Sequence, residues 1–282
     1  MDTIELKNVS YAYPLTKKKA LENISFTFEK GKFYGVIGEN GGGKTTLCSL
    51  LRGLIPNFYK GTLTGEVLFD GKPLAKTDID RLSVDVGYVF QNPFTQISGV
   101  KNTVFEEIAL GLENLGVPPE QIIERVIKVL QLLGIEQLAQ NNPTELSGGQ
   151  RQRVAFASII VMNPDILVID EPTSQLDPEG SAKIFAIINE LKKQGKTIIL
   201  VEHKINMIAE YCDEVLVIHN GRLVKSGAAH TVLSDKNLIN YGILPPESVL
   251  LAYELQAQNM PLDDIPITKS ECCRLIRKRW NI

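Results

Sequence analysis

Alternating and continuous apolar segments predict the strands of this chain. Residues 3–9 and 21–28 alternate apolar and polar side chains, which is typical of two half-buried strands that pair in antiparallel fashion. Short, nearly continuous apolar runs predict further strands, most of them buried, at 33–37, 65–71, 84–90, 165–169 and 197–201. Residues 215–219 and 222–225 predict a hairpin, because Asn220-Gly221 between them is a strong turn signal.

Helical periodicity dominates the middle of the chain. Residues 103–112, 119–133 and 148–162 predict three helices. The second of them has an apolar face that we expect to be formed by Ile122, Ile123, Val126, Ile127, Leu130 and Leu133. Other helices are expected at 45–54, 178–194 and 247–259, and after residue 268.

The order of these elements predicts an α/β fold with three additions to its core. The additions are an antiparallel β subdomain, a helical subdomain inserted at about 92–163, and a small helical C-terminal extension at 227–282. With 282 residues the chain exceeds a typical single domain, which fits a core of about 200 residues with an appendage.

A glycine-rich segment joins the strand at 33–37 to the helix after it and matches the P-loop pattern G-x-x-x-x-G-K-[ST]. Its residues are Gly38, Glu39, Asn40, Gly41, Gly42, Gly43, Lys44, Thr45 and Thr46. Such glycines let backbone N–H groups surround an anion, and the helix directs its N-terminal dipole at the same point. Lys44 is expected to reach the β- and γ-phosphates and Thr45 to bind Mg²⁺. The alternative, a glycine-rich turn beside a surface lysine, would not require a strand before it and a helix after it. The segment therefore predicts a P-loop NTPase, which binds a nucleoside triphosphate.

Polar side chains follow three of the predicted core strands. Asp170 and Glu171 close one strand: Asp170 would hold Mg²⁺ through its water shell, and Glu171 is the candidate general base. Gln91 ends another, where it could touch the metal and the attacking water, and His203 ends a third, where it could contact the γ-phosphate. Paired acids can also form a capping turn, and a lone histidine is usually structural.

A second anion-binding helix start lies far along the chain from the P-loop. Ser147, Gly148, Gly149 and Gln150 combine an N-cap serine, two glycines and the start of a helix. Since one P-loop already holds the phosphates of its own nucleotide, this signature segment, residues 146–150, predicts a nucleotide shared with another subunit. Near the N-terminus, Tyr13 could stack on a base, although tyrosine in such a loop more often packs against protein.

Composition excludes several other functions. A net charge of −3 gives no basic footprint for nucleic acid. Four cysteines without framework spacing are typical of a reducing cytosol. The sequence contains no apolar run of membrane-spanning length and no signal-peptide pattern at its start. If the protein acts at a membrane, we therefore expect it to lie peripherally on the cytoplasmic face and to act through partners.

Together, the P-loop GENGGGKTT, the sequence LSGGQ at 146–150, the run ILVIDEP and His203 resemble the ATP-binding cassette (ABC) family over about residues 1–226. The resemblance implies an ATPase that works as a head-to-tail pair with two MgATP at the interface. It implies roles for Tyr13 on the adenine, Gln91 as the Q-loop glutamine, Asp177 as the D-loop aspartate and His203 as the switch histidine. Residues 147–150 would contact the ATP of the opposite subunit.

A narrower resemblance points to the ATPase subunits of energy-coupling factor (ECF) transporters. It rests on Phe90-Gln91-Asn92-Pro93 with Gln96, on the segments 103–109 and 111–118, and on the proline-bearing tail, which is similar to their dimerisation extension. The implied partners are a second ABC ATPase subunit, a transmembrane coupling subunit and a substrate-binding membrane subunit that takes up a vitamin or metal ion.

Three alternatives stay open at this point. The chain could serve a non-ECF ABC transporter, or it could be a mechanical or regulatory ABC-type ATPase without a transporter. Such ATPases usually carry two cassettes or a long coiled-coil insertion, and this sequence has neither. A small-molecule P-loop kinase would leave residues 146–150 unexplained.

Overall fold

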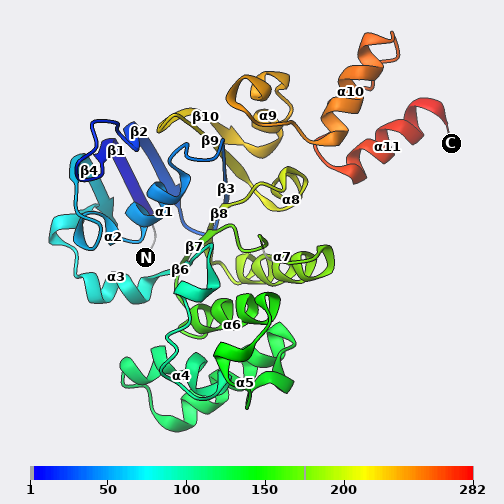
Figure 1. Ribbon diagram of the computed structural model, residues 1–282. Helices are drawn as coiled ribbons and strands as arrows, with labels where there is room; N and C mark the ends of the chain where they lie inside the picture. Colours follow the sequence, from blue (N-terminus) through cyan, green and yellow to red (C-terminus); the bar gives the residue numbers. More distant parts are fainter. Residues whose placement is uncertain (1–2, 175, 282) are drawn as a thin grey trace.

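The computed structural model describes residues 3–174 and 176–281, which form two sheets with helices packed beside them (Figure 1). The larger sheet has six strands in the order β10-β9-β3-β8-β7-β6, and only β10 runs antiparallel to its neighbour. These strands are β3 (Phe33–Ile37), β6 (Val86–Val89), β7 (Ile166–Asp170), β8 (Thr197–Val201), β9 (Glu214–His219) and β10 (Arg222–Ala228). The carboxyl ends of the five parallel strands therefore meet at one edge.

The smaller sheet is antiparallel, in the order β2-β1-β4-β5, and confirms the pairing expected for the first two strands. Its strands are β1 (Thr3–Ala12), β2 (Leu21–Glu29), β4 (Thr62–Phe69) and β5 (Lys72–Pro73). Strand β4 begins three residues before the expected position 65, because Thr62 pairs with Ala12 of β1. The first half of β4 is largely exposed, so its sequence shows no alternation of apolar and polar residues that would predict a strand there.

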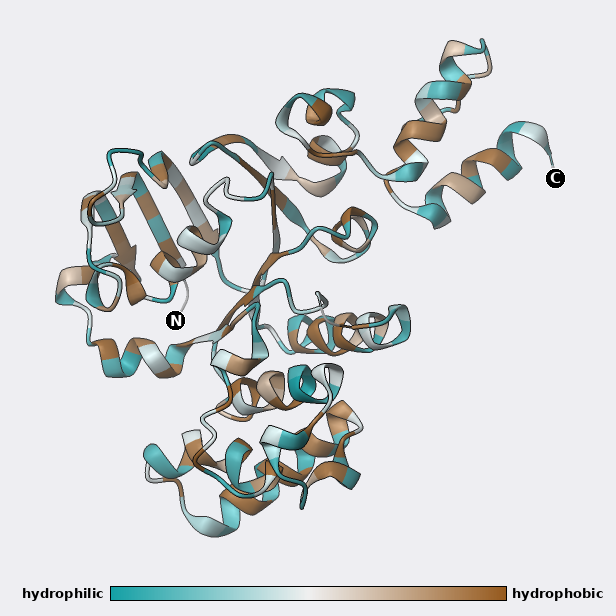
Figure 2. Ribbon diagram, in the orientation of Figure 1, coloured by the Kyte–Doolittle hydropathy of each residue, from teal (hydrophilic) through white to brown (hydrophobic). Residues whose placement is uncertain are grey.

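The larger sheet separates two apolar cores. In β7, Ile166 and Val168 pack into the core shared with the smaller sheet and α1 (Lys44–Leu51), whereas Leu167 and Ile169 pack into the core on the opposite face. Since successive side chains of a strand point to opposite faces, a strand buried on both sides must be apolar throughout. Figure 2 shows this as central strands coloured brown.

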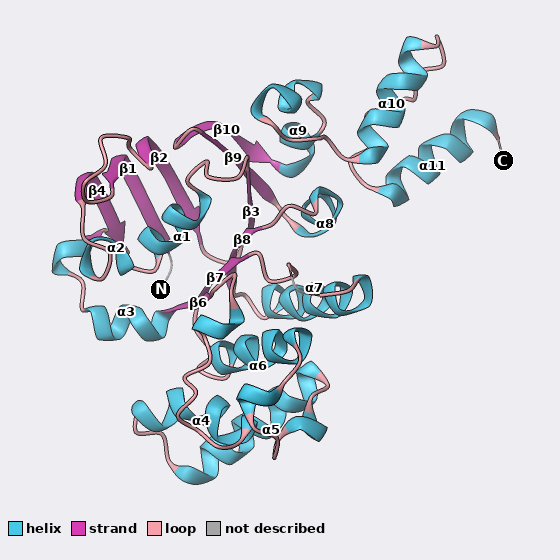
Figure 3. Cartoon of the chain, in the orientation of Figure 1, coloured by secondary structure: helices cyan, strands magenta, loops and turns pink. Residues whose placement is uncertain are grey.

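Helical elements fill the chain between β6 and β7, as the sequence predicts for about 92–163 (Figure 3). They are η2 (Pro93–Thr95), α4 (Val104–Asn114), α5 (Pro119–Leu133), η3 (Glu136–Leu138), η4 (Pro143–Glu145) and α6 (Gly148–Ile160). The apolar face expected for α5 is partly wrong, because Ile123 and Ile127 are exposed and Val129 is buried with the other four residues. Only packing against α4, α6 and α7 decides which of the adjacent apolar residues faces inward.

The remaining helical elements lie outside the segment between β6 and β7. They are α2 (Leu54–Asn57), η1 (Leu74–Lys76), α3 (Ile79–Asp85), α7 (Pro178–Lys193), α8 (Ile205–Tyr211), α9 (Ala229–Leu233), η5 (Lys236–Tyr241), α10 (Glu247–Ala257) and α11 (Lys269–Trp280). The expected helix at 45–54 ends earlier, at Leu51, because Gly53 adopts a left-handed backbone with φ 74°. The short helices α3, α8 and α9 were not expected, and α3 delays the strand predicted from 84 until Val86.

Helices α10 and α11 project from the end of the molecule farthest from α4 and α5 (Figure 1). The Tyr253 hydroxyl on α10 donates to the carbonyl of Ser234 at 2.8 Å, which ties α10 to the segment around α9. Within the described residues, no helix combines the length and the apolarity needed to cross a membrane.

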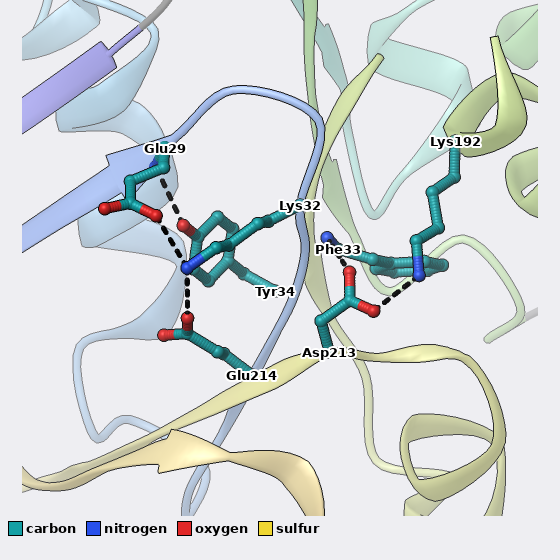
Figure 4. A network of polar contacts seen from close by, with 7 residues as sticks. All are labelled: Glu29, Lys32, Phe33, Tyr34, Lys192, Asp213 and Glu214. Atoms are coloured by element: carbon teal, nitrogen blue, oxygen red, sulfur yellow. Dashed lines mark hydrogen bonds and ion pairs between the residues drawn. The ribbon is translucent and has the colours of Figure 1, made fainter. Parts of the chain in front are cut away.

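A polar network fixes the start of β3, the strand that leads into the P-loop (Figure 4). The Lys32 ammonium lies 2.6 Å from carboxylate oxygens of both Glu29 and Glu214, and these contacts raise the pKa of Lys32. The backbone N–H of Phe33 donates to Asp213, whose other oxygen pairs with Lys192 of α7 at 2.6 Å. The network thereby joins β2, β3, α7 and the chain at β9.

Replacing Thr268 by Ala is expected to destabilise α11 locally by about 1 kcal/mol, because this helix buries only Cys272 and depends on its cap. The Thr268 hydroxyl accepts the N–H of Glu271, whose carboxylate accepts the N–H of Thr268. Hydrogen exchange of the α11 amides should accelerate about five-fold. Arg274→Ala, on the exposed side of α11, is the control, and equal exchange in both variants would contradict the prediction.

Candidate functional site

The P-loop occupies the edge at which the parallel strands end. Gly38 has φ 154°, and a Cβ there would lie 2.0 Å from the carbonyl oxygen of Ile218. Gly43, the residue before α1, has φ 110°, and its Cβ would lie 2.5 Å from the carbonyl oxygen of Ala20. Side chains at these two positions would force the backbone apart, so the loop requires glycine where the motif has it.

Lys44 is held against the loop by its own ammonium group. Its side chain is buried, and Nζ donates to the carbonyl oxygens of Gly38 and Glu39, both at 2.9 Å. Burial lowers the pKa of Lys44, while the nearby carboxylates of Glu171 and Asp170 act in the opposite direction. Because an ammonium group has three donors, one remains for an anion in the loop.

Asp170 lies at the carboxyl end of β7 and is 1% exposed. Burial raises the pKa of its carboxyl group, and the hydroxyl groups of Thr45 and Tyr88 act in the opposite direction. The Tyr88 hydroxyl lies 3.4 Å from Oδ2, whereas Oδ1 has no hydrogen-bond partner among the described residues. A buried carboxylate oxygen without a partner is costly unless something else binds it.

Glu171 follows β7 and contacts residues at the ends of the two neighbouring strands. Its Oε2 accepts a hydrogen bond from Gln91 Nε2 at 2.6 Å, and its Oε1 lies 2.8 Å from His203 Nε2. Gln91 follows β6 and His203 follows β8, which lie on either side of β7. Glu171 itself has φ 48°, a left-handed conformation that costs free energy in a non-glycine residue and often occurs at functional sites.

These side chains share one cleft of about 490 Å³ with the P-loop. Its lining consists of Tyr13, Ala20, Asn40, Gly41, Gly43, Lys44, Thr45, Thr46, Gln91, Glu171 and His203. The Tyr13 hydroxyl lies 3.1 Å from Thr46 Oγ1, which holds the tyrosine at the edge of the loop. Apart from Ala20, every lining residue is one that the sequence analysis named. Besides the P-loop, these residues include Tyr13, Gln91, Glu171 and His203, which lie far apart along the chain.

The signature segment and Asp177 do not line this cleft. Ser147 is the N-cap of α6, and its hydroxyl and the Gln150 side chain form a reciprocal capping box. Asp177 caps α7 by accepting the N–H of Gly180 at 2.7 Å. Both segments thus have a local structural role within the chain, and a contact with another subunit's nucleotide stays a prediction.

Two residues around the cleft were missed by the sequence analysis. Tyr88 lies on β6 and reaches Asp170 on the neighbouring strand β7, and no local pattern in the sequence pairs two residues on different strands. Ala20 lines the cleft through its place next to Gly43, for which the sequence offers no signal.

Comparisons with known proteins agree with this geometry. Residues 21–174 match the family model described as ABC transporter. A relative from Methanospirillum hungatei, named energy-coupling factor transporter ATP-binding protein EcfA2, is 37% identical over 97% of this chain and 68% of that protein.

Solved structures show the same fold. The structure of cbiO1 from Clostridium perfringens, described as part of the ABC transporter complex cbiONQ, has a TM-score of 0.73 and 34% identity, over 85% of this chain and 94% of that one. The ATP-binding cassette MJ0796, in a dimeric post-hydrolysis state bound to ADP and Pi, has a TM-score of 0.71 and 29% identity, over 80% and 98% of the two chains. The chain described here belongs to the ABC transporter family, as an ATP-binding subunit that hydrolyses ATP to ADP and phosphate.

Proposed function

We propose that this chain is the ATPase subunit of an ECF-type importer of a vitamin or metal ion. It would lie peripherally on the cytoplasmic face of the cell membrane and act as one half of a cassette dimer. ATP binding would close the dimer, and hydrolysis would reopen it. The observation that supports the catalytic part most directly is the placement of Glu171 between Gln91 and His203, beside Lys44.

The polar side chains of the cleft and the P-loop backbone have distinct roles in this proposal. Glu171 acts as the general base that polarises the attacking water, Gln91 positions that water, and His203 contacts the γ-phosphate. Lys44 and the backbone of residues 38–46 bind the phosphates, and Tyr13 stacks on the adenine. In-line attack on a phosphoryl group needs little covalent chemistry, so the protein mainly positions groups and stabilises charge.

The residues that would hold Mg²⁺ are Thr45 and Asp170, with Gln91 nearby. The buried Oδ1 of Asp170 has no partner among the described residues and suits a metal-bound water. When bound, Mg²⁺ neutralises charge on the β- and γ-phosphates.

The dimer would place the signature segment of each subunit, Ser147 to Gln150, on the nucleotide of the other, with Asp177 at the same interface. Residues 1–226 would form the nucleotide-binding domain and 227–282 an extension that contributes to dimerisation. Support for dimerisation comes from the dimeric state of MJ0796, and support for an ECF-type complex comes from the EcfA2 relative.

The test of the ECF assignment is the composition of the complex that forms around the tagged full-length chain in its native membranes. We expect a second ABC ATPase subunit, one transmembrane coupling subunit and one small substrate-binding membrane protein. Recovery with two membrane-spanning halves and no separate substrate-binding membrane subunit would indicate a non-ECF transporter. An active ATPase with no membrane partner would favour the mechanical or regulatory alternative.

A further inference from the structure

The guanidinium of Arg151 is fixed beneath the signature segment. Arg151 lies in the first turn of α6 and is 7% exposed. Its Nη2 donates to the carbonyl oxygens of Thr144 at 2.8 Å and Leu146 at 3.0 Å. Both carbonyls belong to the chain that leads into Ser147, so Arg151 sets the position of the signature serine.

Phe94 covers this guanidinium from the Q-loop, the segment 91–98 that begins at Gln91. The Cζ atom of Arg151 lies 3.9 Å from the centroid of the Phe94 ring, which is the geometry of a cation–π contact. Within the described part of the chain, no carboxylate pairs with Arg151, and its buried Nε has no hydrogen-bond partner. The ring therefore supplies the main electrostatic partner of this buried cation besides the two carbonyls. Phe94 itself is 61% exposed.

A short and constrained segment joins Phe94 to Gln91. Only Asn92 and Pro93 separate them, and Asn92 Oδ1 accepts the N–H of Phe94 at 3.0 Å. Proline fixes one backbone angle of this segment. The N–H of Phe90 donates to Gln96 Oε1 at 3.1 Å and closes the loop on itself. A shift of the Gln91 backbone is therefore expected to displace the Phe94 ring.

Glu107 fastens the far end of the same loop. This carboxylate of α4 is 4% exposed and accepts both the backbone N–H of Ser98 at 2.6 Å and its hydroxyl at 2.8 Å. The loop is thus closed at Gln96 and anchored at Ser98, and the ring of Phe94 between these points lies against Arg151.

We infer that Phe94 and Arg151 are positioning residues that couple the two ATP sites of the dimer through one subunit. Gln91, in contact with Glu171, would report the state of this subunit's own ATP. The Phe94 ring and the Arg151 guanidinium would pass that state to Leu146 and Ser147, where the segment proposed to contact the partner's ATP begins. The inference rests on the dimeric ATPase proposed above.

The test compares Phe94→Leu, which removes the ring and keeps an apolar side chain, with Phe94→Tyr, which keeps the ring. Because the Phe94 side chain is mostly exposed, we expect both variants to fold, and thermal unfolding measures their stability. The readouts are ATP affinity of the subunit, ATP-driven dimer formation, and the rate and Hill coefficient of steady-state hydrolysis. The purified full-length protein is used, with its second ATPase subunit if that is a different chain, and without membrane proteins.

For Phe94→Leu we expect unchanged ATP affinity of the subunit and a Hill coefficient that falls toward 1. Dimer formation should be roughly five-fold weaker and turnover roughly five-fold slower, because a five-fold change corresponds to the free energy of a partly buried cation–π contact. Phe94→Tyr should resemble the wild type. In an Arg151→Gln background, Phe94→Leu should add little, because the neutral amide leaves no cation for the ring to contact.

Wild-type cooperativity in Phe94→Leu, equal losses in both Phe94 variants, or fully additive losses with Arg151→Gln would each overturn the coupling. If the wild-type protein itself binds and hydrolyses ATP without cooperativity, the dimeric mechanism fails, and the coupling fails with it. The wild-type measurement therefore separates a failure of the proposed function from a failure of the coupling alone.

Discussion

Replacing Glu171 by Gln is expected to lower kcat for ATP hydrolysis about 10²- to 10⁴-fold while ATP binding persists, the range typical of losing a general base. The carboxylate contacts both Gln91 and His203, and glutamine has nearly the same shape but accepts no proton. Phosphate release in steady state measures the rate, and nucleotide titration measures binding. Glu179→Gln, an exposed acid-to-amide change on α7, is the matched control.

A second readout of Glu171→Gln is the oligomeric state in MgATP, measured by size-exclusion chromatography with light scattering. If the two phosphate-binding segments act across a self-pairing interface, the variant should shift from monomer to dimer. Bound ATP without a shift would indicate that the obligate partner is a different cassette. Hydrolysis by the variant at the wild-type rate would contradict the role of Glu171 as the base.

Replacing Lys44 by Met is expected to weaken ATP binding roughly 100-fold, because charge-assisted hydrogen bonds contribute about 1.5–3 kcal/mol each. Lys44 is the buried cation of the P-loop, and two of its donors already hold the carbonyls of Gly38 and Glu39. Loss of those bonds should also reduce the free energy of unfolding by about 1–2 kcal/mol. Calorimetric titration with ATP measures the affinity, and thermal unfolding measures the stability.

Lys183→Met is the control for Lys44→Met, since Lys183 is an exposed lysine on α7 that pairs with Glu179. It should change neither affinity nor stability measurably. A folded Lys44→Met protein that binds ATP as tightly as the control would show that the ammonium group does not contact the phosphates.

The convergence of the site depends on the order of strands in the larger sheet. Strand β8 lies between β3 and β7, and β7 lies between β8 and β6. This order puts His203 and Gln91 on the two sides of Glu171, although they are 32 and 80 residues away along the chain. In open α/β sheets, ligands bind at the carboxyl ends of the strands, which is where this cleft lies.

Some features of the site were available from the sequence because they are local. The P-loop is one, since its pattern of glycines, lysine and threonine lies within a few consecutive residues and the positive φ angles of Gly38 and Gly43 favour glycine. The capping box at Ser147 and Gln150 is another, because its two partners are three residues apart. Spacing along the chain is sufficient to predict such features.

Other features depend on contacts between distant segments. The sequence could not choose between Ile123 and Val129 for the buried face of α5, because both lie near its edge and only neighbouring helices decide. Nor could it pair Arg151 with Phe94 or Tyr88 with Asp170, since each pair joins different elements.

The sequence by itself determined that the chain has a phosphate-binding loop, an acidic strand end and a second capped helix start, because hydrogen-bond spacing and allowed backbone angles set these within a few residues. Only the tertiary structure decided that Glu171 lies between Gln91 and His203, and that the Q-loop contacts the signature segment through Phe94 and Arg151. The physical reason is that sheet order and helix docking are chosen by burial of apolar surface over the whole domain, which no local pattern records.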